Sequence, residues 1–177
     1  MVQSVELLLD ADLDAAVRAQ WRALAAAGLA SQARHTAPSN RPHVTFTATA
    51  GRWSESVEGR LSDAAQGVPL TVRLGALVVF GPGPRHVLAR LVVPSQDLLA
   101  LHVTIAAAVP GSEGAVTHAA PGDWTPHVTL ARQVSAEQVP TALAALAGPV
   151  RPREPVGSGV AVRRWDGTEQ REWLIAP

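Results

Sequence analysis

The chain has 177 residues and contains no lysine, since all 15 of its basic residues are arginine. The absence of lysine excludes Schiff-base chemistry, a phosphate-loop lysine and a covalent lysyl-nucleotide intermediate. Ligation of nucleic acid through an adenylated lysine is therefore excluded as well. The chain also contains no cysteine, which excludes disulfides, thiolate zinc sites and a cysteine nucleophile.

Neither sign of charge is in excess, with 15 basic against 15 acidic residues. This balance argues against a protein that coats nucleic acid through long-range electrostatics, and it leaves room for a local cationic groove. No apolar run is long enough to cross a bilayer, and residues 1–6 lack the basic and apolar regions of a signal peptide. We therefore expect a soluble cytoplasmic protein with no membrane partner.

Apolar residues make up 47% of the chain and charged residues 17%, which is enough apolar material for a buried core. Alternating and helical hydrophobic spacings predict the secondary structure. Strands are expected at residues 5–9, 43–49, 70–80, 87–93, 127–132, 156–165 and 172–175, and helices at 12–27, 54–65, 95–109 and from Ser135 onward, where Gln138 completes a capping box. A Gly-Pro-Gly-Pro turn at residues 81–84 predicts a hairpin between the strands that flank it.

The two halves of the chain follow the same order of strand, helix, loop, strand, helix and strand. The loops ahead of the middle strands share letters, and residues 35–46 align with residues 118–130 with one extra residue in the second. A repeat of this length predicts an internal duplication. We therefore expect an α+β fold in which two antiparallel sheets, flanked by helices, line a central cleft. Residues 1–177 would form a single two-lobed domain, with lobes of approximately 1–82 and 83–177 and an exchange of strands between them left open.

Each repeat carries a His-Val-Thr strand directly after a proline, at His43 to Thr45 and at His127 to Thr129. In a strand, side chains two residues apart lie on the same face. Each histidine therefore projects beside its threonine, while the valine between them points into the core. If a pseudo-twofold axis relates the two lobes, two imidazoles and two hydroxyls line one pocket.

This set of side chains suits phosphoryl chemistry without a metal. An imidazole has an unperturbed pKa of about 6.5, so one histidine can be neutral and the other protonated near pH 7. The neutral ring removes a proton from the attacking hydroxyl, and the charged ring protonates the departing oxygen. The threonine hydroxyls can donate to non-bridging phosphate oxygens. Zinc sites usually have three or four ligands, whereas each motif offers one histidine, so we expect neither a metal nor another cofactor.

The other four histidines have simpler interpretations. A third His-Val-Thr starts at His102, but it falls in the predicted helix 95–109, where residues two apart point in different directions. His35 and His118 occupy matching positions in the two repeat loops, where rimming the cleft and stabilising the loop are both compatible with the sequence. His86 follows the predicted turn, and we expect it to be structural.

Two His-x-Thr motifs, 42–46 and 126–132, some 84 residues apart in a short duplicated α+β chain, resemble the two-histidine (2H) phosphoesterase superfamily. One bacterial branch of it is named 2′-5′ RNA ligase, and its relatives include cyclic nucleotide phosphodiesterases. The resemblance extends over essentially the whole chain. It implies a hydrolase with a bilobal fold that opens 2′,3′-cyclic phosphates of RNA ends or nucleotides to 2′-phosphates. The reverse reaction, 2′-5′ RNA ligation, requires neither ATP nor lysine.

The resemblance also implies roles for individual residues. His43 and His127 would be the acid and base, in an order that the sequence leaves open, and Thr45 and Thr129 would anchor the phosphate. Arg132 would then bind a phosphate or form a surface ion pair; in a regular strand it lies on the face opposite to His127. Arg41 and Trp124 precede the motifs, so they would lie at the cleft mouth, where Trp124 either stacks on a base or covers the core.

The expected partner is an RNA terminus or a small nucleotide with a cyclic phosphate. The chain has no tyrosine and two phenylalanines, which provides few stacking platforms and argues against a long RNA substrate. We expect a monomer without an obligate protein partner. Two alternatives to a metal-independent phosphodiesterase remain. One is a non-catalytic binder of a phosphorylated or nucleotide ligand in the same cleft, and the other is a metal-dependent hydrolase.

Overall fold

The computed structural model describes residues 2–109, 118–147 and 154–176. In this part of the chain, seven strands and four α-helices alternate in the predicted order, together with three short 3-10 turns. The elements are β1 (Val2–Leu9), α1 (Ala11–Ala26), η1 (Gln32–Arg34), β2 (His43–Ala50), α2 (Glu55–Ala64), η2 (Ala65–Gly67), β3 (Leu70–Phe80), β4 (His86–Val92), α3 (Gln96–Ala108), β5 (His127–Val134), η3 (Ala136–Gln138), α4 (Val139–Leu146), β6 (Val156–Asp166) and β7 (Arg171–Ala176).

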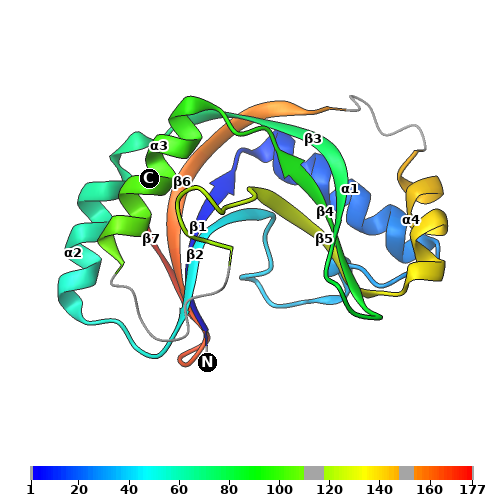
Figure 1. Ribbon diagram of the computed structural model, residues 1–177, viewed down its shortest axis with the longest axis horizontal. Helices are drawn as coiled ribbons and strands as arrows, with labels where there is room; N and C mark the ends of the chain where they lie inside the picture. The colour runs from blue at the N-terminus through cyan, green and yellow to red at the C-terminus, as the bar shows by residue number, and fades with distance from the viewer. Residues whose placement is uncertain (1, 110–117, 148–153, 177) are drawn as a thin grey trace.

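All strand pairs are antiparallel and form one continuous order, β2-β1-β6-β3-β4-β5, with β7 paired to β6. The first part of β3 pairs with β6 and its second part pairs with β4, so β3 joins two groups of strands. Figure 1 shows the strands arching between two pairs of helices, α2 with α3 on one side and α1 with α4 on the other. The α+β class with an antiparallel sheet flanked by helices is therefore confirmed. The lobe boundary near residue 82 stays a prediction.

Local sequence explains where the helices begin and which face they bury. The carboxylate of Asp10 caps α1 by accepting a hydrogen bond from the Leu13 N–H at 2.8 Å. The apolar stripe of α1 that the spacing predicts is buried, and it comprises Leu13, Val17, Trp21 and Leu24. The capping box of Ser135 and Gln138 is also present, although it opens the 3-10 turn η3 ahead of α4. None of the helices among the described residues is long and apolar enough to span a membrane.

The helices pack against strands that are distant in sequence. Helix α1 follows β1 but packs against β5 and α4, whereas α3 packs against β2 and α2. These contacts draw the two ends of the strand order together, and the terminal strands β2 and β5 contact each other. Both His-Val-Thr segments lie on these two terminal strands, so the fold brings the repeated motifs to one place.

Candidate active site

The two motif strands show the predicted alternation. His43 and Thr45 are partly exposed, and Val44 between them is fully buried. His127 and Thr129 are likewise partly exposed on either side of a fully buried Val128. Because β2 and β5 contact each other, both polar faces open on the same region of the molecule.

A β-bulge follows each motif at the same position. In β2, Thr45 lies opposite Glu6 and Thr47 opposite Val5, so Phe46 is the extra residue. In β5, Thr129 lies opposite Ala89 and Ala131 opposite Leu88, so Leu130 is the extra residue. A bulge bends its strand and reverses the alternation of the residues that follow.

The bulge in β5 corrects the expected direction of Arg132. Regular alternation places this residue on the face opposite to Thr129, but the extra residue Leu130 returns Arg132 to the side of Thr129. Arg132 is exposed and lines a pocket together with Thr129 and His43. The positive φ of Gln133, 63°, shows that β5 stays irregular just beyond this point.

Both candidate catalytic histidines are held by the backbone in the same way. Nδ1 of His43 lies 2.6 Å from the carbonyl oxygen of Arg41, and Nδ1 of His127 lies 2.8 Å from that of Thr125. A carbonyl oxygen only accepts, so Nδ1 carries a proton and donates it in each ring. Nε2 of each ring is then the nitrogen that exchanges a proton with a substrate.

The surroundings of His43 are charged. Nε2 of His43 lies 3.7 Å from Oε1 of Glu6, a buried residue of β1. Glu6 is paired with Arg163 of β6, whose NH2 lies 2.7 Å from Oε2. Burial by itself would raise the pKa of Glu6, but the charges of His43 and Arg163 and hydrogen bonds from Ser4 and Arg163 outweigh it and hold the pKa below its usual value. Glu6 is therefore a carboxylate at neutral pH.

The surroundings of His127 are apolar and cationic. Its ring lies 4.7 Å from that of Phe80, measured between centroids. Burial lowers the pKa of His127, and the charges of Arg132 and His43 lower it further, against the effect of the hydrogen bond to Thr125. His127 is therefore mostly neutral at pH 7, and its Nε2 has a free lone pair.

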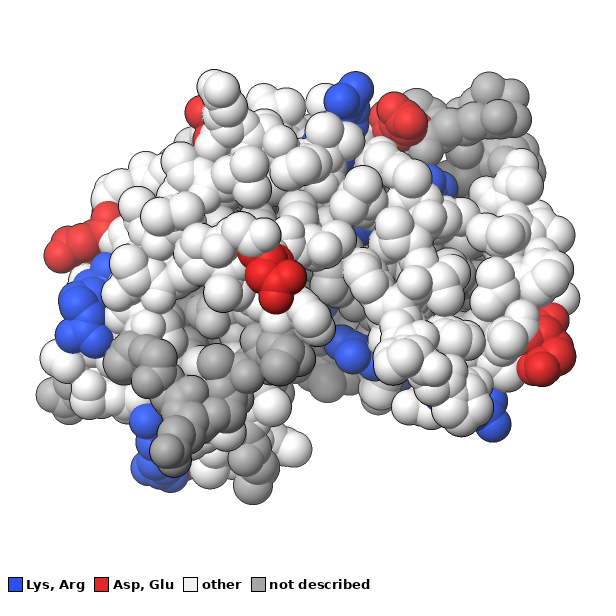
Figure 2. Space-filling view, in the orientation of Figure 1, with Lys and Arg blue, Asp and Glu red and all other residues white. Residues whose placement is uncertain are grey.

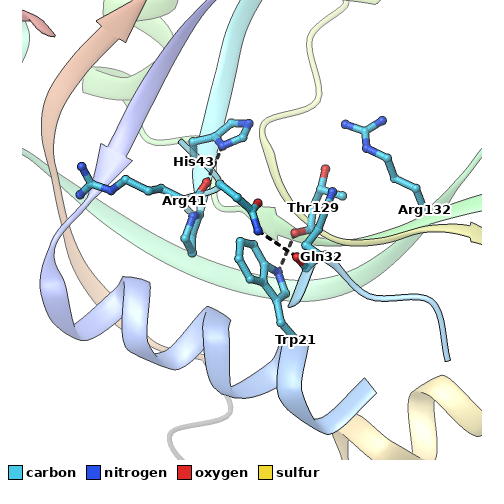
Figure 3. A pocket seen from close by; sticks show the side chains of 8 residues that line it. Trp21, Gln32, Arg41, His43, Thr129 and Arg132 are labelled. Carbon is cyan, nitrogen blue, oxygen red and sulfur yellow. Dashed lines mark hydrogen bonds between the residues drawn. The ribbon is translucent and has the colours of Figure 1, made fainter. Parts of the chain in front are cut away.

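A pocket opens beside His43 and Thr129. Figure 3 shows these two residues reaching the same space from β2 and β5, with Trp21 of α1 below them. The remaining side chains that line it are polar or cationic apart from one proline, and they are Gln32, Asn40, Arg41, Pro42 and Arg132. Charged side chains are sparse on the face in Figure 2, where arginine atoms lie in the depression near its centre.

Two indoles hold the backbone of the motif threonines. Nε1 of Trp124, in the loop ahead of β5, donates to the carbonyl oxygen of Thr45 on β2 at 3.0 Å. Nε1 of Trp21, on α1, donates to the carbonyl oxygen of Thr129 on β5, also at 3.0 Å. Trp124 therefore ties β2 to the loop that leads into β5, and Trp21 ties β5 to α1.

Trp21→Phe is expected to remove one of these hydrogen bonds while keeping an aromatic ring. An unsatisfied carbonyl in a half-buried position costs on the order of 1–2 kcal/mol in unfolding free energy. A small displacement of Thr129 is expected to lower kcat/KM for the phosphodiester hydrolysis that the sequence leads us to expect by about tenfold. Trp53→Phe is the matched control, because Trp53 donates to Oγ1 of Thr49, farther along β2. An equal loss of kcat/KM in both variants would contradict a role of Trp21 in placing the motif.

The remaining predicted residues lie in and around this region. Trp124 stacks on His102 of α3, with centroids 3.9 Å apart, and its contact with a substrate base stays a prediction. His102 is buried, is bonded to the Ala119 carbonyl and lies with its ring 6.4 Å from that of Phe46, on the buried side of the first motif strand. His35 and His118 are exposed and line no part of the pocket beside His43.

Sequence reasoning missed four neighbours of the histidines, namely Glu6, Arg163, Gln32 and Asn40. A signal existed for the first two, since Glu6 interrupts the apolar segment 5–9 and Arg163 directly follows the apolar run 160–162. Gln32 and Asn40 carry no comparable signal, because polar loop residues are ordinary. Across the ranges 2–109, 118–147 and 154–176, no three His, Cys, Asp or Glu side chains gather as a metal site.

Comparison with known proteins agrees with the two-histidine geometry. The family model described as "2'-5' RNA ligase superfamily" matches residues 9–169. The chain belongs to this superfamily, a group of two-histidine phosphoesterases. Membership supports an enzyme of phosphodiesterase type. No curated protein matches the chain significantly.

Solved structures share the fold at low sequence identity. Kluyveromyces marxianus Usb1 aligns with a TM-score of 0.57 and 12% identity over 99% of this chain and 98% of its own, and its complex with uridine monophosphate aligns with a TM-score of 0.56 and 13% identity over the same shares. Escherichia coli LigT, in complex with 3′-AMP, aligns with a TM-score of 0.51 and 16% identity over 97% of this chain and 95% of its own. At such identities the likeness concerns the fold.

Proposed function

We propose that this protein is a metal-independent phosphodiesterase that opens 2′,3′-cyclic phosphates of nucleotides or RNA ends to 2′-phosphates. One observation carries the proposal. Two histidines from opposite terminal strands each donate Nδ1–H to a carbonyl oxygen and leave Nε2 for proton transfer. A motif threonine stands beside each ring on the same face of its strand.

The proposed reaction balances its protons between the two rings. One Nε2 accepts a proton from water as the water oxygen attacks phosphorus. The bond between phosphorus and the ribose 3′-oxygen breaks, and the other Nε2 protonates that oxygen. Hydroxyls of Thr45 and Thr129 donate to the non-bridging oxygens, where charge gathers in the transition state. With a 5′-hydroxyl in place of water as the attacking group, the same ring opening gives a 2′-5′ linkage between two RNA ends with no ATP.

The pocket beside His43 supports a nucleotide as the substrate. Arg132 provides a cationic donor for phosphate, and Gln32 and Asn40 provide amides that hydrogen-bond a base or a ribose. Arg41 also lines the pocket, with its guanidinium turned away from the ring of His43 in Figure 3. The structures of Usb1 and LigT named above hold uridine monophosphate and 3′-AMP. A mononucleotide or a short RNA end is therefore the proposed ligand, bound by a monomer in the cytoplasm.

Incubation of the protein with 2′,3′-cyclic AMP in excess EDTA tests this proposal. We expect the 2′-phosphate to accumulate at a rate that the chelator does not change, with phosphorus NMR to identify the isomer. Activity that EDTA abolishes would indicate a metal-dependent hydrolase. Binding of the nucleotide without turnover would indicate the non-catalytic binder.

A further inference from the structure

The indole of Trp124 rests on the histidine of the third His-Val-Thr, which the proposed reaction does not use. The rings of Trp124 and His102 lie 3.9 Å apart between centroids, and their planes are inclined by only 10°, so they stack. His102 lies on α3, is 1% exposed, and has its Nε2 3.0 Å from the carbonyl oxygen of Ala119. One imidazole therefore holds the loop ahead of β5 in two ways, by a stacking contact and by a hydrogen bond.

The imidazole of His102 is neutral and has one N–H group to donate. Burial lowers the pKa of His102, against the effect of hydrogen bonds to the backbone of Ala119 and Phe46. Because a carbonyl oxygen only accepts, Nε2 carries the proton of the neutral ring and donates it to Ala119. A phenylalanine in this place could stack on Trp124 and a glutamine could donate to Ala119, but neither side chain could do both.

The bulge residue of the first motif completes a cluster of three rings. Phe46, the extra residue of β2, lies 5.7 Å from Trp124 and 6.4 Å from His102 between ring centroids. It directly follows Thr45, whose carbonyl oxygen accepts the hydrogen bond from Nε1 of Trp124 at 3.0 Å. The cluster of His102, Trp124 and Phe46 therefore joins α3, the loop ahead of β5 and β2 next to the motif threonine.

The other two residues of the third His-Val-Thr point elsewhere, as expected for neighbours on a helix. Val103 is 49% exposed. The hydroxyl of Thr104 donates to the carbonyl oxygen of Leu101 at 2.9 Å and to that of Ala64, at the end of α2, at 3.3 Å. His102 is thus the member of this triplet that faces the loop ahead of β5.

We propose that His102 is a positioning residue for Thr45, which it holds through Trp124 without touching the substrate. The inference rests on the function proposed above, in which the hydroxyl of Thr45 donates to a non-bridging phosphate oxygen. The ring of His102 behind the indole keeps Trp124 in the orientation in which Nε1 meets the carbonyl oxygen of Thr45. Without that support the indole turns, and Thr45 loses the hydrogen bond that fixes its backbone beside the phosphate.

Kinetics of two single variants test this role, because each variant removes one contact of His102 and keeps the other. His102→Phe keeps a ring that can stack, and His102→Gln keeps an N–H donor in the place of Nε2. We expect each to lower kcat for a 2′,3′-cyclic nucleotide by about tenfold while KM stays within about twofold, since a misplaced anchor weakens the transition state more than the bound substrate. His102→Ala removes both contacts and should lower kcat by about 10²-fold.

Ile105→Ala is the matched control, because Ile105 is a fully buried residue of the same helix and lies outside the ring cluster. It should lower the thermal midpoint about as much as His102→Ala and leave kcat within about twofold of wild type. Thr104→Val removes a hydrogen bond on the α2 side of α3 and should leave kcat equally unchanged. A loss of kcat in Ile105→Ala as large as in His102→Ala would overturn the proposal, since both losses would then follow from a loosened helix.

Proton NMR of the indole groups gives a readout that does not depend on any activity. The Nε1–H of Trp124 is bonded to a backbone carbonyl, so we expect its exchange with water to be slow in wild type. In His102→Ala this exchange should be at least about tenfold faster, whereas the Nε1–H of Trp21, bonded to Thr129, should keep its wild-type rate. His102→Phe provides the same comparison if His102→Ala fails to fold. An unchanged exchange rate of Trp124 would overturn the role of His102.

The two readouts separate this inference from the function on which it rests. If wild type cleaves no 2′,3′-cyclic nucleotide and exchange at Trp124 still rises in His102→Ala, the proposed function fails while the hold of His102 on Trp124 stands. If wild type is active and His102→Ala keeps both its kcat and the slow exchange of Trp124, the role of His102 fails while the function stands.

Discussion

His43→Ala and His127→Ala are each expected to lower kcat/KM for a 2′,3′-cyclic nucleotide by about 10²–10⁴, because each variant lacks one of the two proton transfers. The double variant should be little worse than either single one, since residues that act as a unit are not additive. Both rings are partly exposed, so the free energy of unfolding should change by less than about 1 kcal/mol. Steady-state kinetics and thermal unfolding by circular dichroism measure the two quantities.

His86→Ala is the control for these variants. His86 lies at the start of β4, opposite Val134, whereas His127 is at the other end of β5. Loss of one imidazole there should leave kcat/KM within about twofold of wild type. A full loss of activity in His86→Ala, or full activity in either motif variant, would remove the basis for two-histidine catalysis.

The pH profile of kcat/KM in wild type should be bell-shaped. The ring that acts as the base must be neutral. Burial and nearby cations lower the pKa of His127, so with His127 as the base the acidic limb should lie below pH 6.5. Activity then falls again as pH rises and the acid loses its proton. A profile that rises to a plateau without a basic limb would show that no histidine acts as the acid.

Arg163→Met is expected to lower the free energy of unfolding by about 3–5 kcal/mol, because it leaves the carboxylate of Glu6 buried without its cation. The pair is well enclosed, with exposed fractions of 4% for the side chain of Arg163 and 7% for that of Glu6. The variant also loses the hydrogen bond from NH1 of Arg163 to the carbonyl oxygen of Ser39, which supports the loop ahead of β2. Chemical denaturation measures the change.

The double variant Glu6→Leu/Arg163→Met should recover most of this loss, since removing both partners of a buried pair leaves no unpaired charge. Arg132→Met is the matched control for the loss of one arginine, and because Arg132 is exposed, its effect should stay within about 0.5 kcal/mol. A single variant Arg163→Met as stable as wild type would show that Glu6 takes up a proton when it loses its partner.

The fold was largely predictable because its signals are local. Hydrophobic alternation marks the motif strands, and the residues from Gly81 to Pro84 mark the hairpin of β3 and β4. The capping box near Ser135 marks the start of the 3-10 turn that precedes α4. The third His-Val-Thr was set aside correctly, since His102 is a buried helix residue. The two motif histidines and threonines could be selected from repetition alone, and their catalytic roles stay predictions.

The rest of the site depends on strand pairing, which a single sequence does not encode locally. The bulge at Leu130 reverses the direction of Arg132, and no feature of the residues 127–132 distinguishes a bulged strand from a regular one. Glu6 and Arg163 are 157 positions apart in the chain, and they meet only because β1 pairs with β6. The indole of Trp21 reaches Thr129 through the packing of α1 on β5, which the order of elements does not reveal.

The hydrogen bonds from Nδ1 of His43 and His127 to backbone carbonyls have a consequence for how this protein can diverge. The orientation of each ring is set by the backbone carbonyl two residues earlier in the chain. No second side chain therefore has to be conserved to orient the imidazole. Neighbouring positions are then free to accept new residues that alter ligand preference while the reactive nitrogens stay where they are. Such a fold tolerates sequence changes around the site, in keeping with its being shared at 12–16% identity with the solved structures.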